Sequence, residues 1–204
     1  MLCFFLQYIS IIFGRSKKEL ATKVVSKVLL ELELLRICSA DTAGSTSSAS
    51  APALGGKYEV FFSFRGEVTR SFTEFLSYIL DKAGIRNFRY DDELVGEKEV
   101  PALLKAIQES TISIPIFSRD YASSIWRLRE LEQMVECHTT MGHKILPIFY
   151  DVEPSDVRHQ IGSYEEAFRQ HQNHFDEKIV QGWKKALTEV GQMKGWELEN
   201  ETNG

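Results

Sequence analysis

Residues 111–134 read TISIPIFSRDYASSIWRLRELEQM and combine an apolar run, a short polar loop and an amphipathic segment. The apolar run, Thr111 to Phe117, has the length and composition of a strand that is buried on both faces. After the polar loop 118–124, apolar residues return at helical spacing from Ile125 onward. We therefore expect a buried strand that leads through a loop into a helix.

Short apolar runs and helical patterns alternate in the same way on both sides of this segment. Strand–helix–strand connections of this length predict parallel pairing with right-handed crossovers. Strands that are apolar almost throughout indicate a sheet covered on both faces, so the sequence predicts a doubly wound α/β fold. The expected strands are 58–64, 85–88, 112–117 and 145–150, and the expected helices are 69–82, 100–108, 125–138, 164–175 and 178–192.

The first 56 residues differ from the rest in composition. Residues 1–38 join an apolar leader, 1–13, to an amphipathic helix expected over 19–37. Residues 39–56 are rich in Ser, Thr, Ala, Gly and Pro and cannot build a core, so we expect a flexible linker there. The folded domain is expected over 57–197, followed by a tail, 198–204.

The apolar leader is short for a membrane span. A helix of this length, at ~1.5 Å per residue, reaches roughly 20 Å, whereas the hydrocarbon core is ~30 Å thick. Arg15, Lys17 and Lys18 follow the leader, and this order would keep the rest of the chain in the cytosol. We favour a signal anchor or interfacial helix that associates with a membrane through residues 1–18 over a dispensable leader.

Composition excludes several classes of function. A net charge of −5 and a pI near 5.6 give no basic field for phosphate backbones, so nucleic acid is not expected as the main partner. The three cysteines, at positions 3, 38 and 137, are far apart, which favours a reducing, cytoplasmic environment. No second cysteine pair completes a four-ligand set around Cys137, so no metal site is expected.

Ligands of doubly wound sheets bind beyond the carboxyl ends of the strands. The segment that follows each strand is, taken alone, typical of a solvated loop. Because all of these segments lie at the same edge of the sheet, we expect that edge to be functional. On the helix that follows the third strand, Trp126 and Glu130 are four residues apart and are expected on one face. Such a pair can hold a ring-bearing ligand and stabilise a cation, although a tryptophan at a helix start is more often a core anchor. The segments in question are 65–67, 90–99, 118–124 and 151–158.

Motifs of other enzyme classes are missing from these segments. There is no Gly-x-Gly-x-x-Gly after a strand and no Gly-Lys-Ser/Thr loop, and a Gly-x-Ser-x-Gly elbow is also absent. A phosphoacceptor receiver needs an aspartate at the end of the third strand, where Ser118 stands. His171 and His174 are expected on the surface, because such pairs rarely bind metal without further ligands.

Four blocks of sequence carry a resemblance to a known family. They are KYEVFFSFRGEVTRSF at 57–72, NFRYDDELVGEKEVPALLKAI at 87–107, SRDYASSIWRLRELEQM at 118–134 and ILPIFYDVEPSDVRHQIGSYEEAF at 145–168. Over residues 57–196 the chain resembles the TIR domains of plant disease-resistance receptors, and the flax rust-resistance type looks nearest. The resemblance implies the TIR fold, a flavodoxin-like parallel sheet of about five strands flanked by helices. The receptors continue into a nucleotide-binding module and leucine-rich repeats, so we interpret the chain as a TIR-only protein or a TIR segment.

The resemblance also implies an activity, the cleavage of NAD+ or NADP+ at the nicotinamide glycosidic bond with hydrolase or ADP-ribosyl cyclase-like products. NAD(P)+ is then the substrate, and no separate cofactor is implied. The catalytic glutamate of the family motif W-C-x-x-E-L falls on Glu130, and Trp126 would stack on the nicotinamide or the ribose. The family also implies self-association with other TIR domains and signalling in plant innate immunity. The resemblance implies that the nucleotide site is lined by Ser63, Phe64, Arg65, Gly66, Glu67 and Gly96.

The chain departs from the family pattern at several of these positions. Arg127 replaces the motif cysteine and places a cation beside Glu130, where it can repel a cationic substrate. Val68 replaces an aspartate, which removes a helix N-cap and leaves Thr69 as a weaker substitute. Gly96 and Glu97 replace a cation and a glycine in a loop that the family uses for assembly.

The second hypothesis is therefore a non-catalytic TIR–TIR interaction module. An acid that points into bulk water, or that Arg127 closes off, would favour this hypothesis. In either case we expect a cytoplasmic protein or one anchored to an endomembrane with its TIR domain facing the cytosol.

Overall fold

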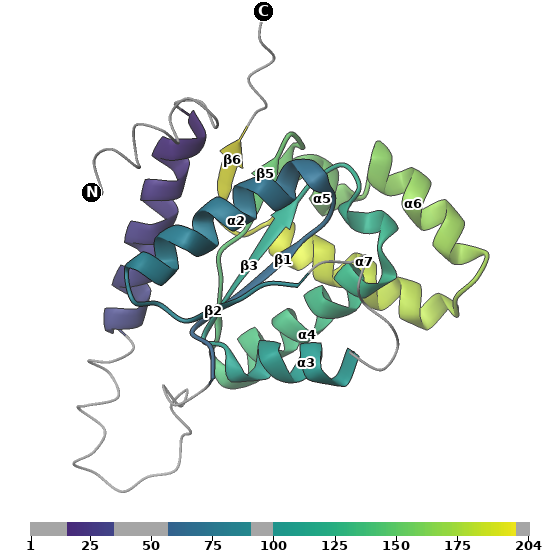
Figure 1. Cartoon of the computed structure of the whole chain (residues 1–204). Helices are drawn as coiled ribbons and strands as arrows, with labels where there is room; N and C mark the ends of the chain where they lie inside the picture. The colour runs from purple at the N-terminus through teal and green to yellow at the C-terminus, as the bar shows by residue number, and fades with distance from the viewer. Residues whose placement is uncertain (1–15, 35–56, 91–99, 199–204) are drawn as a thin grey trace, which may run out of the picture.

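A parallel sheet forms the centre of the computed structural model, which describes residues 16–34, 57–90 and 100–198 (Figure 1). The strand order is β2-β1-β3-β5-β6, and every pairing is parallel. β4 also pairs with β3, so β4 and β5 form one interrupted strand and the order is that of flavodoxin-like sheets. The predicted fold class is confirmed. The strands are β1 (Val60–Phe64), β2 (Asn87–Phe88), β3 (Ile112–Phe117), β4 (Lys144–Ile145), β5 (Ile148–Tyr150) and β6 (Trp196–Leu198).

Two features of the strands differ from the sequence prediction. The single strand expected over 145–150 is interrupted between β4 and β5, at Leu146 and Pro147, because proline has no amide hydrogen to donate to the sheet. β6 was not expected as a strand, and it pairs with β5 at the edge of the sheet. A three-residue strand that follows a glycine and begins with a tryptophan carries too short a pattern to be recognised from sequence.

All five expected helices are present, with shifted ends. Two short helices were not expected as helices, namely the 3-10 turn η3 (Tyr121–Ser123) and α5 (Pro154–His159). Both lie in the polar segments that follow β3 and β5, so they shape the edge where a ligand is expected. The remaining helices are α2 (Glu67–Lys82), α3 (Val100–Glu109), α4 (Ile125–Met141), α6 (Ser163–Gln172) and α7 (Glu177–Gly191).

The sheet separates two hydrophobic cores. Neighbouring residues of a strand point to opposite faces, so Phe62 belongs to one core and Phe61 to the other. The first core lies between the sheet and α2, and the second lies between the sheet and the layer of α3, α4 and α7 (Figure 1). Helices therefore cover both faces of the sheet, as the apolar composition of the strands predicts.

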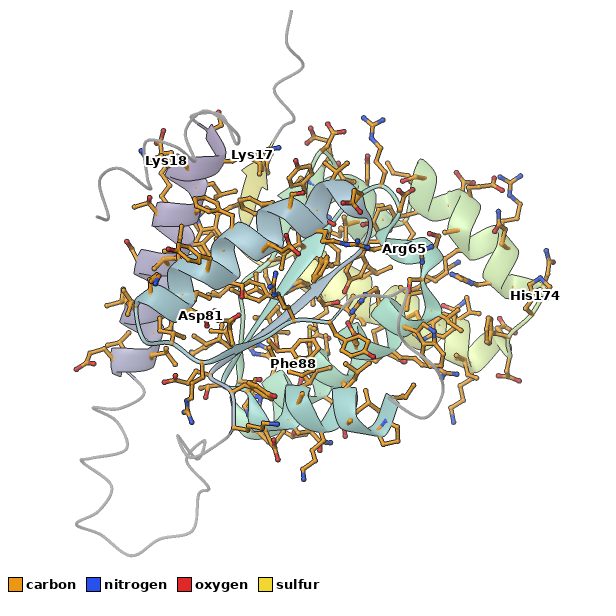
Figure 2. The ribbon with its side chains drawn as sticks, viewed as in Figure 1. Lys17, Lys18, Arg65, Asp81, Phe88 and His174 are labelled. Atoms are coloured by element: carbon orange, nitrogen blue, oxygen red, sulfur yellow. The ribbon has the colours of Figure 1, made fainter. Side chains whose placement is uncertain are left out.

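The N-terminal helix, residues 16–34, completes the first core. It lies beside α2 in Figure 1, and Lys17 and Lys18 mark its first turn in Figure 2. Val24, Val28 and Leu32 are at most 1% exposed and pack in the same cluster as α2 and the sheet. The expected amphipathic helix is therefore present, and the packed core extends beyond the predicted domain start at Lys57. Of the residues described, none belongs to a helix long and apolar enough to cross a membrane.

Several predicted segments lie outside the described residues. These are the apolar leader 1–13, the linker 39–56 and all of the tail 198–204 except Leu198, which belongs to β6.

The packing of the N-terminal helix predicts unequal effects for two leucines on the same helix. Leu32→Ala removes a side chain that is 1% exposed, so we expect the free energy of unfolding to fall by about 2–5 kcal/mol. Leu30→Ala is the matched control, because Leu30 is 53% exposed and its loss should cost less than about 0.5 kcal/mol. Urea unfolding followed by circular dichroism measures both. Equal, small effects of the two variants would show that the helix does not pack on the domain.

Candidate functional site

The strand order places the expected ligand crevice between β1 and β3. β2 pairs on one side of β1 and β3 pairs on the other, so the chain reverses its direction of winding at this point. In doubly wound sheets the crevice beyond the carboxyl ends of such a strand pair is the usual ligand site. Ser63 is the penultimate residue of β1, and α4 reaches the same edge through the segment after β3.

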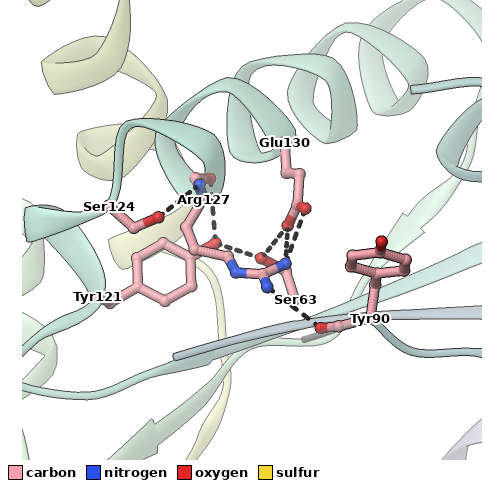
Figure 3. A network of polar contacts seen from close by, with 6 residues as sticks. All are labelled: Ser63, Tyr90, Tyr121, Ser124, Arg127 and Glu130. Atoms are coloured by element: carbon pink, nitrogen blue, oxygen red, sulfur yellow. Dashed lines mark hydrogen bonds and ion pairs between the residues drawn. The ribbon is translucent and has the colours of Figure 1, made fainter. Parts of the chain in front are cut away.

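Glu130 lies at this edge in a buried polar network (Figure 3). Nη1 of Arg127 donates to both carboxylate oxygens of Glu130, at 2.7 and 2.8 Å. The hydroxyl of Ser63 donates to Oε2 of the same carboxylate at 2.7 Å. Arg127 is completely buried and Glu130 is 2% exposed. The predicted acid thus lies between β1 and the start of α4, and its oxygens already accept hydrogen bonds from Ser63 and Arg127.

A helix cap and a tyrosine fix the start of α4 beside this network. Ser124 is the N-cap of α4, and its Oγ accepts a hydrogen bond from the backbone amide of Arg127 at 3.4 Å. The hydroxyl of the buried Tyr121 lies 2.8 Å from Oγ of Ser63 and 3.4 Å from the carbonyl oxygen of Arg127. Tyr121 was not predicted as a site residue, because a tyrosine in an apolar cluster is indistinguishable by pattern from a core residue.

The charge of Arg127 sits where a helix disfavours a cation. The first turn of a helix carries the positive end of the helix dipole, so a cation there is destabilised by about 0.3–1 kcal/mol when exposed. Here the guanidinium is compensated by Glu130, by the carbonyl oxygen of Tyr90 at 3.1 Å from Nη2, and by the ring of Phe64 at 5.7 Å. Removing one partner of a buried ion pair typically costs about 3–5 kcal/mol, so the pair constrains the whole edge.

Trp126 has different neighbours from Glu130. Its side chain is only partly buried, and the guanidinium of Arg129 lies 5.0 Å from its ring. Glu130 instead points to Ser63 and Arg127. Ring stacking on a nicotinamide would therefore have to compete with Arg129, and the role of Trp126 stays a prediction.

The turn after β1 is built on Gly66. Its φ of 88° and ψ of 157° lie in a region that only glycine adopts readily, and Gly66 is the N-cap of α2. The prediction that Val68 and Thr69 stand at the helix N-cap is wrong, because α2 starts at Glu67. Val68 lies inside the first turn and is 55% exposed, while the Thr69 hydroxyl donates to the Arg65 carbonyl at 2.5 Å.

A cavity of about 200 Å³ opens at the ends of β1, β3 and β5. Three of the predicted substrate-binding residues line it, but the buried Ser63, Phe64 and Glu130 do not. Gly96, the remaining predicted loop residue, lies outside the described residues. The residues that line this cavity are Arg65, Gly66, Glu67, Val68, Thr69, Ser118, Arg119, Asp120, Tyr150 and Asp151.

A second cavity, of about 440 Å³, adjoins the first along the same edge. Arg119 and Asp151 line both cavities, and Nη2 of Arg119 is 3.5 Å from Oδ2 of Asp151. Asp151 adopts a left-handed backbone conformation, with φ of 53°, directly after β5. Both residues belong to rim segments that the sequence predicts, but no role was predicted for either.

Two buried residues contact backbone carbonyl groups of the segment that follows β3. The Tyr164 hydroxyl donates to the carbonyl oxygen of Ser118 at 2.9 Å, and burial raises the pKa of Tyr164 well above its usual value, so the donor stays protonated. Nε2 of His171 lies 2.8 Å from the carbonyl oxygen of Ala122. The prediction that His171 is a surface residue is wrong, because its ring packs against Trp183, whereas His174 is exposed (Figure 2).

Comparison with known proteins identifies the family of the chain. The family model of the TIR domain matches residues 57–203. The chain is 46% identical over 157 residues to the disease resistance protein RPV1 of Vitis rotundifolia, which covers 76% of this chain and 11% of that protein. It is also 41% identical over 152 residues to the TMV resistance protein N of Nicotiana glutinosa. This alignment covers 72% of this chain and 13% of that protein. The chain thus spans a small part of the length of these curated relatives.

A solved structure is similar to this chain in both fold and sequence. The TIR domains of the activated Roq1 resistosome, which directly recognises the pathogen effector XopQ, superpose with a TM-score of 0.63 and 41% identity. The match covers 72% of this chain and 92% of that chain. The described residues, the family model and these plant relatives agree, and the chain belongs to the TIR domain family.

Proposed function

We propose that this protein is a TIR-domain NAD(P)+ nucleosidase that cleaves the nicotinamide glycosidic bond, with Glu130 as the catalytic carboxylate. The observation that carries the proposal is the 2.7 Å hydrogen bond between Ser63 and Glu130. This bond joins the carboxyl end of β1 to α4, and a carboxylate near the edge where doubly wound sheets bind ligands supports the proposal. NAD+ or NADP+ is the substrate, and no further cofactor is proposed.

A single carboxylate is sufficient for this chemistry. The nicotinamide ring of NAD+ carries a positive charge as a pyridinium and leaves as a neutral molecule, so its departure needs no general acid. The ribose then develops oxocarbenium character, as sugars do during glycoside hydrolysis. A fixed negative charge near the ribose stabilises that transition state, and it can also accept hydrogen bonds from the ribose hydroxyls.

The relatives support the biological part of the proposal. RPV1 and N are named as resistance proteins, and Roq1 TIR domains belong to an activated resistosome. We infer that this protein signals in plant innate immunity and that its activity depends on self-association with other TIR domains. A cytoplasmic location and membrane association through residues 1–18 stay predictions.

One observation favours the second candidate, a non-catalytic TIR–TIR interaction module. Arg127 donates to both carboxylate oxygens of Glu130, and both side chains are buried. In this arrangement Glu130 is closed to a ribose, which is the situation that the sequence analysis associated with the interaction module. Catalysis therefore requires Arg127 to leave the carboxylate, whereas an interaction module does not.

Replacing the acid tests the catalytic proposal. We expect Glu130→Gln to lower the rate of nicotinamide release from NAD+ by about 10²–10³, the range found when one group that stabilises a transition state is removed. Glu136→Gln is the matched control, because Glu136 is exposed on the same helix and its loss should leave the rate within twofold. Nicotinamide is quantified by chromatography.

A folding control accompanies this experiment. Glu130→Gln leaves Arg127 buried without its partner, so the variant is expected to be less stable. The double variant Arg127→Met/Glu130→Gln removes both charges, and it should be folded and still inactive. Release of nicotinamide by folded double variant at the wild-type rate would contradict the role of Glu130.

Self-association predicts a dependence of activity on protein concentration. We expect nicotinamide release per protomer to increase with total protein, in parallel with the fraction of dimer or larger species in sedimentation velocity. An interaction module would associate without releasing nicotinamide. A release rate per protomer that is the same in dilute and concentrated protein would contradict the requirement for assembly.

A further inference from the structure

Arg127 connects two parts of the chain that are far apart in sequence. One of its terminal nitrogens, Nη1, donates to both oxygens of Glu130 on the same helix, at 2.7 and 2.8 Å. The other, Nη2, donates to the backbone carbonyl of Tyr90, at 3.1 Å. Figure 3 shows the guanidinium lying between the carboxylate and this carbonyl. A single rigid fork therefore links the candidate catalytic acid to the backbone that follows β2.

The surroundings of the guanidinium hold it in this position. Arg127 is completely buried, and its guanidinium carbon is 5.7 Å from the centroid of the Phe64 ring. The planar fork of arginine has a fixed geometry, so the two sets of hydrogen bonds constrain one another. A displacement of the Tyr90 carbonyl would remove the hydrogen bond that holds Nη2. The guanidinium could then turn, and Nη1 would no longer be aligned with the Glu130 carboxylate.

The described arrangement also limits what Glu130 can bind. Among the described residues, Arg127 donates two hydrogen bonds and Ser63 one to the carboxylate, which is 2% exposed. A carboxylate can accept about four hydrogen bonds, but Glu130 is almost fully buried, so a ribose hydroxyl reaches it only when a side chain that covers it moves. Ser63 and Arg127 are both buried, but the guanidinium of Arg127 ends a long side chain with several rotatable bonds, so Arg127 is the donor whose departure we consider.

We propose that Arg127 is a positioning residue that keeps Glu130 closed while its fork is anchored on the Tyr90 carbonyl, and that release of this anchor opens Glu130 to the ribose. This inference rests on the proposed function for its catalytic consequence. The proposal rests on contacts seen in this chain, which carries Arg127 where the quoted family motif has a cysteine.

The population of the open state sets the apparent affinity for substrate. When only a fraction of the protein is competent to bind, the apparent dissociation constant rises in inverse proportion to that fraction. Loss of the fork should therefore lower KM for NAD+ and leave kcat nearly unchanged. A residue that only stabilised the fold would change the unfolding temperature without this separation of KM from kcat.

The experiment compares three variants of the full chain with the wild type. Arg127→Met removes the fork. Arg127→Lys keeps a cation for Glu130, but a single ammonium group cannot bridge to Tyr90 in the same way. Arg169→Met is the matched control, because Arg169 and Glu166 form an ion pair at the same spacing of three residues on the exposed surface of α6. Thermal unfolding is measured for each protein, and only folded variants are compared.

The first readout does not depend on activity. Glycine ethyl ester is coupled to accessible carboxyl groups with a carbodiimide, and the labelled residues are identified by mass spectrometry. We expect Glu130 to be labelled about tenfold faster in Arg127→Met than in the wild type. Arg127→Lys should fall between the two, and Arg169→Met should match the wild type. The exposed Glu136 serves as the internal standard.

The second readout is nicotinamide release at varied NAD+ concentration. We expect Arg127→Met to lower KM by about tenfold with kcat within twofold, which corresponds to about 1.4 kcal/mol. Equal labelling of Glu130 in the wild type and in Arg127→Met would overturn the inference, as would a lower kcat with unchanged KM. Faster labelling without nicotinamide release by any protein would support the positioning role and contradict the nucleosidase proposal. Nicotinamide release with unchanged labelling of Glu130 would support the nucleosidase proposal and contradict the positioning role of Arg127.

Discussion

The buried ion pair between Arg127 and Glu130 is the constraint on which the arrangement of the site depends. Two opposite charges are removed from water at the start of α4, and each needs the other to stay buried. The pair orients Glu130 toward Ser63 on β1 and orients Arg127 toward the Tyr90 carbonyl after β2. Three segments of the chain that meet at the carboxyl edge of the sheet are thereby fixed relative to one another.

The fold supplies the rigid frame for this pair. Parallel strands bring the ends of β1 and β3 to one edge, and the N-cap at Ser124 starts α4 so that Arg127 and Glu130 face β1. The hydrophobic cores on the two faces of the sheet keep β1 in place, and the N-terminal helix 16–34 contributes to one of them. A helix outside the residues matched by the TIR family model therefore belongs to the packing that supports the site.

Much of this architecture could be predicted from the sequence. Apolar strands separated by amphipathic helices define a doubly wound sheet, and the rim segments follow from the strand ends. Glu130 was placed at the rim for the same reason. The partners of Glu130 could not be predicted, because they depend on side-chain directions rather than on spacing. Arg127 was recognised as a cation near the acid, but its fork to Tyr90 joins residues 37 positions apart.

Other differences have similar physical causes. His171 was expected on the surface because its helix is polar, yet α6 turns this residue toward Trp183 and the carbonyl of Ala122. The cap of α2 was placed too late, because Gly66 starts the helix through its backbone conformation rather than through a side chain. The packing of the N-terminal helix was also missed. An amphipathic pattern shows that one face is apolar, but it does not identify the surface that covers this face.

The most direct test of the account is a crystal structure of the protein with a non-hydrolysable NAD+ analogue. The account predicts that the ribose of the analogue lies within hydrogen-bond distance of Glu130, beside Ser63, and that Arg127 has left the carboxylate. A bound analogue whose ribose lies elsewhere, with the Arg127–Glu130 pair unchanged, would contradict it.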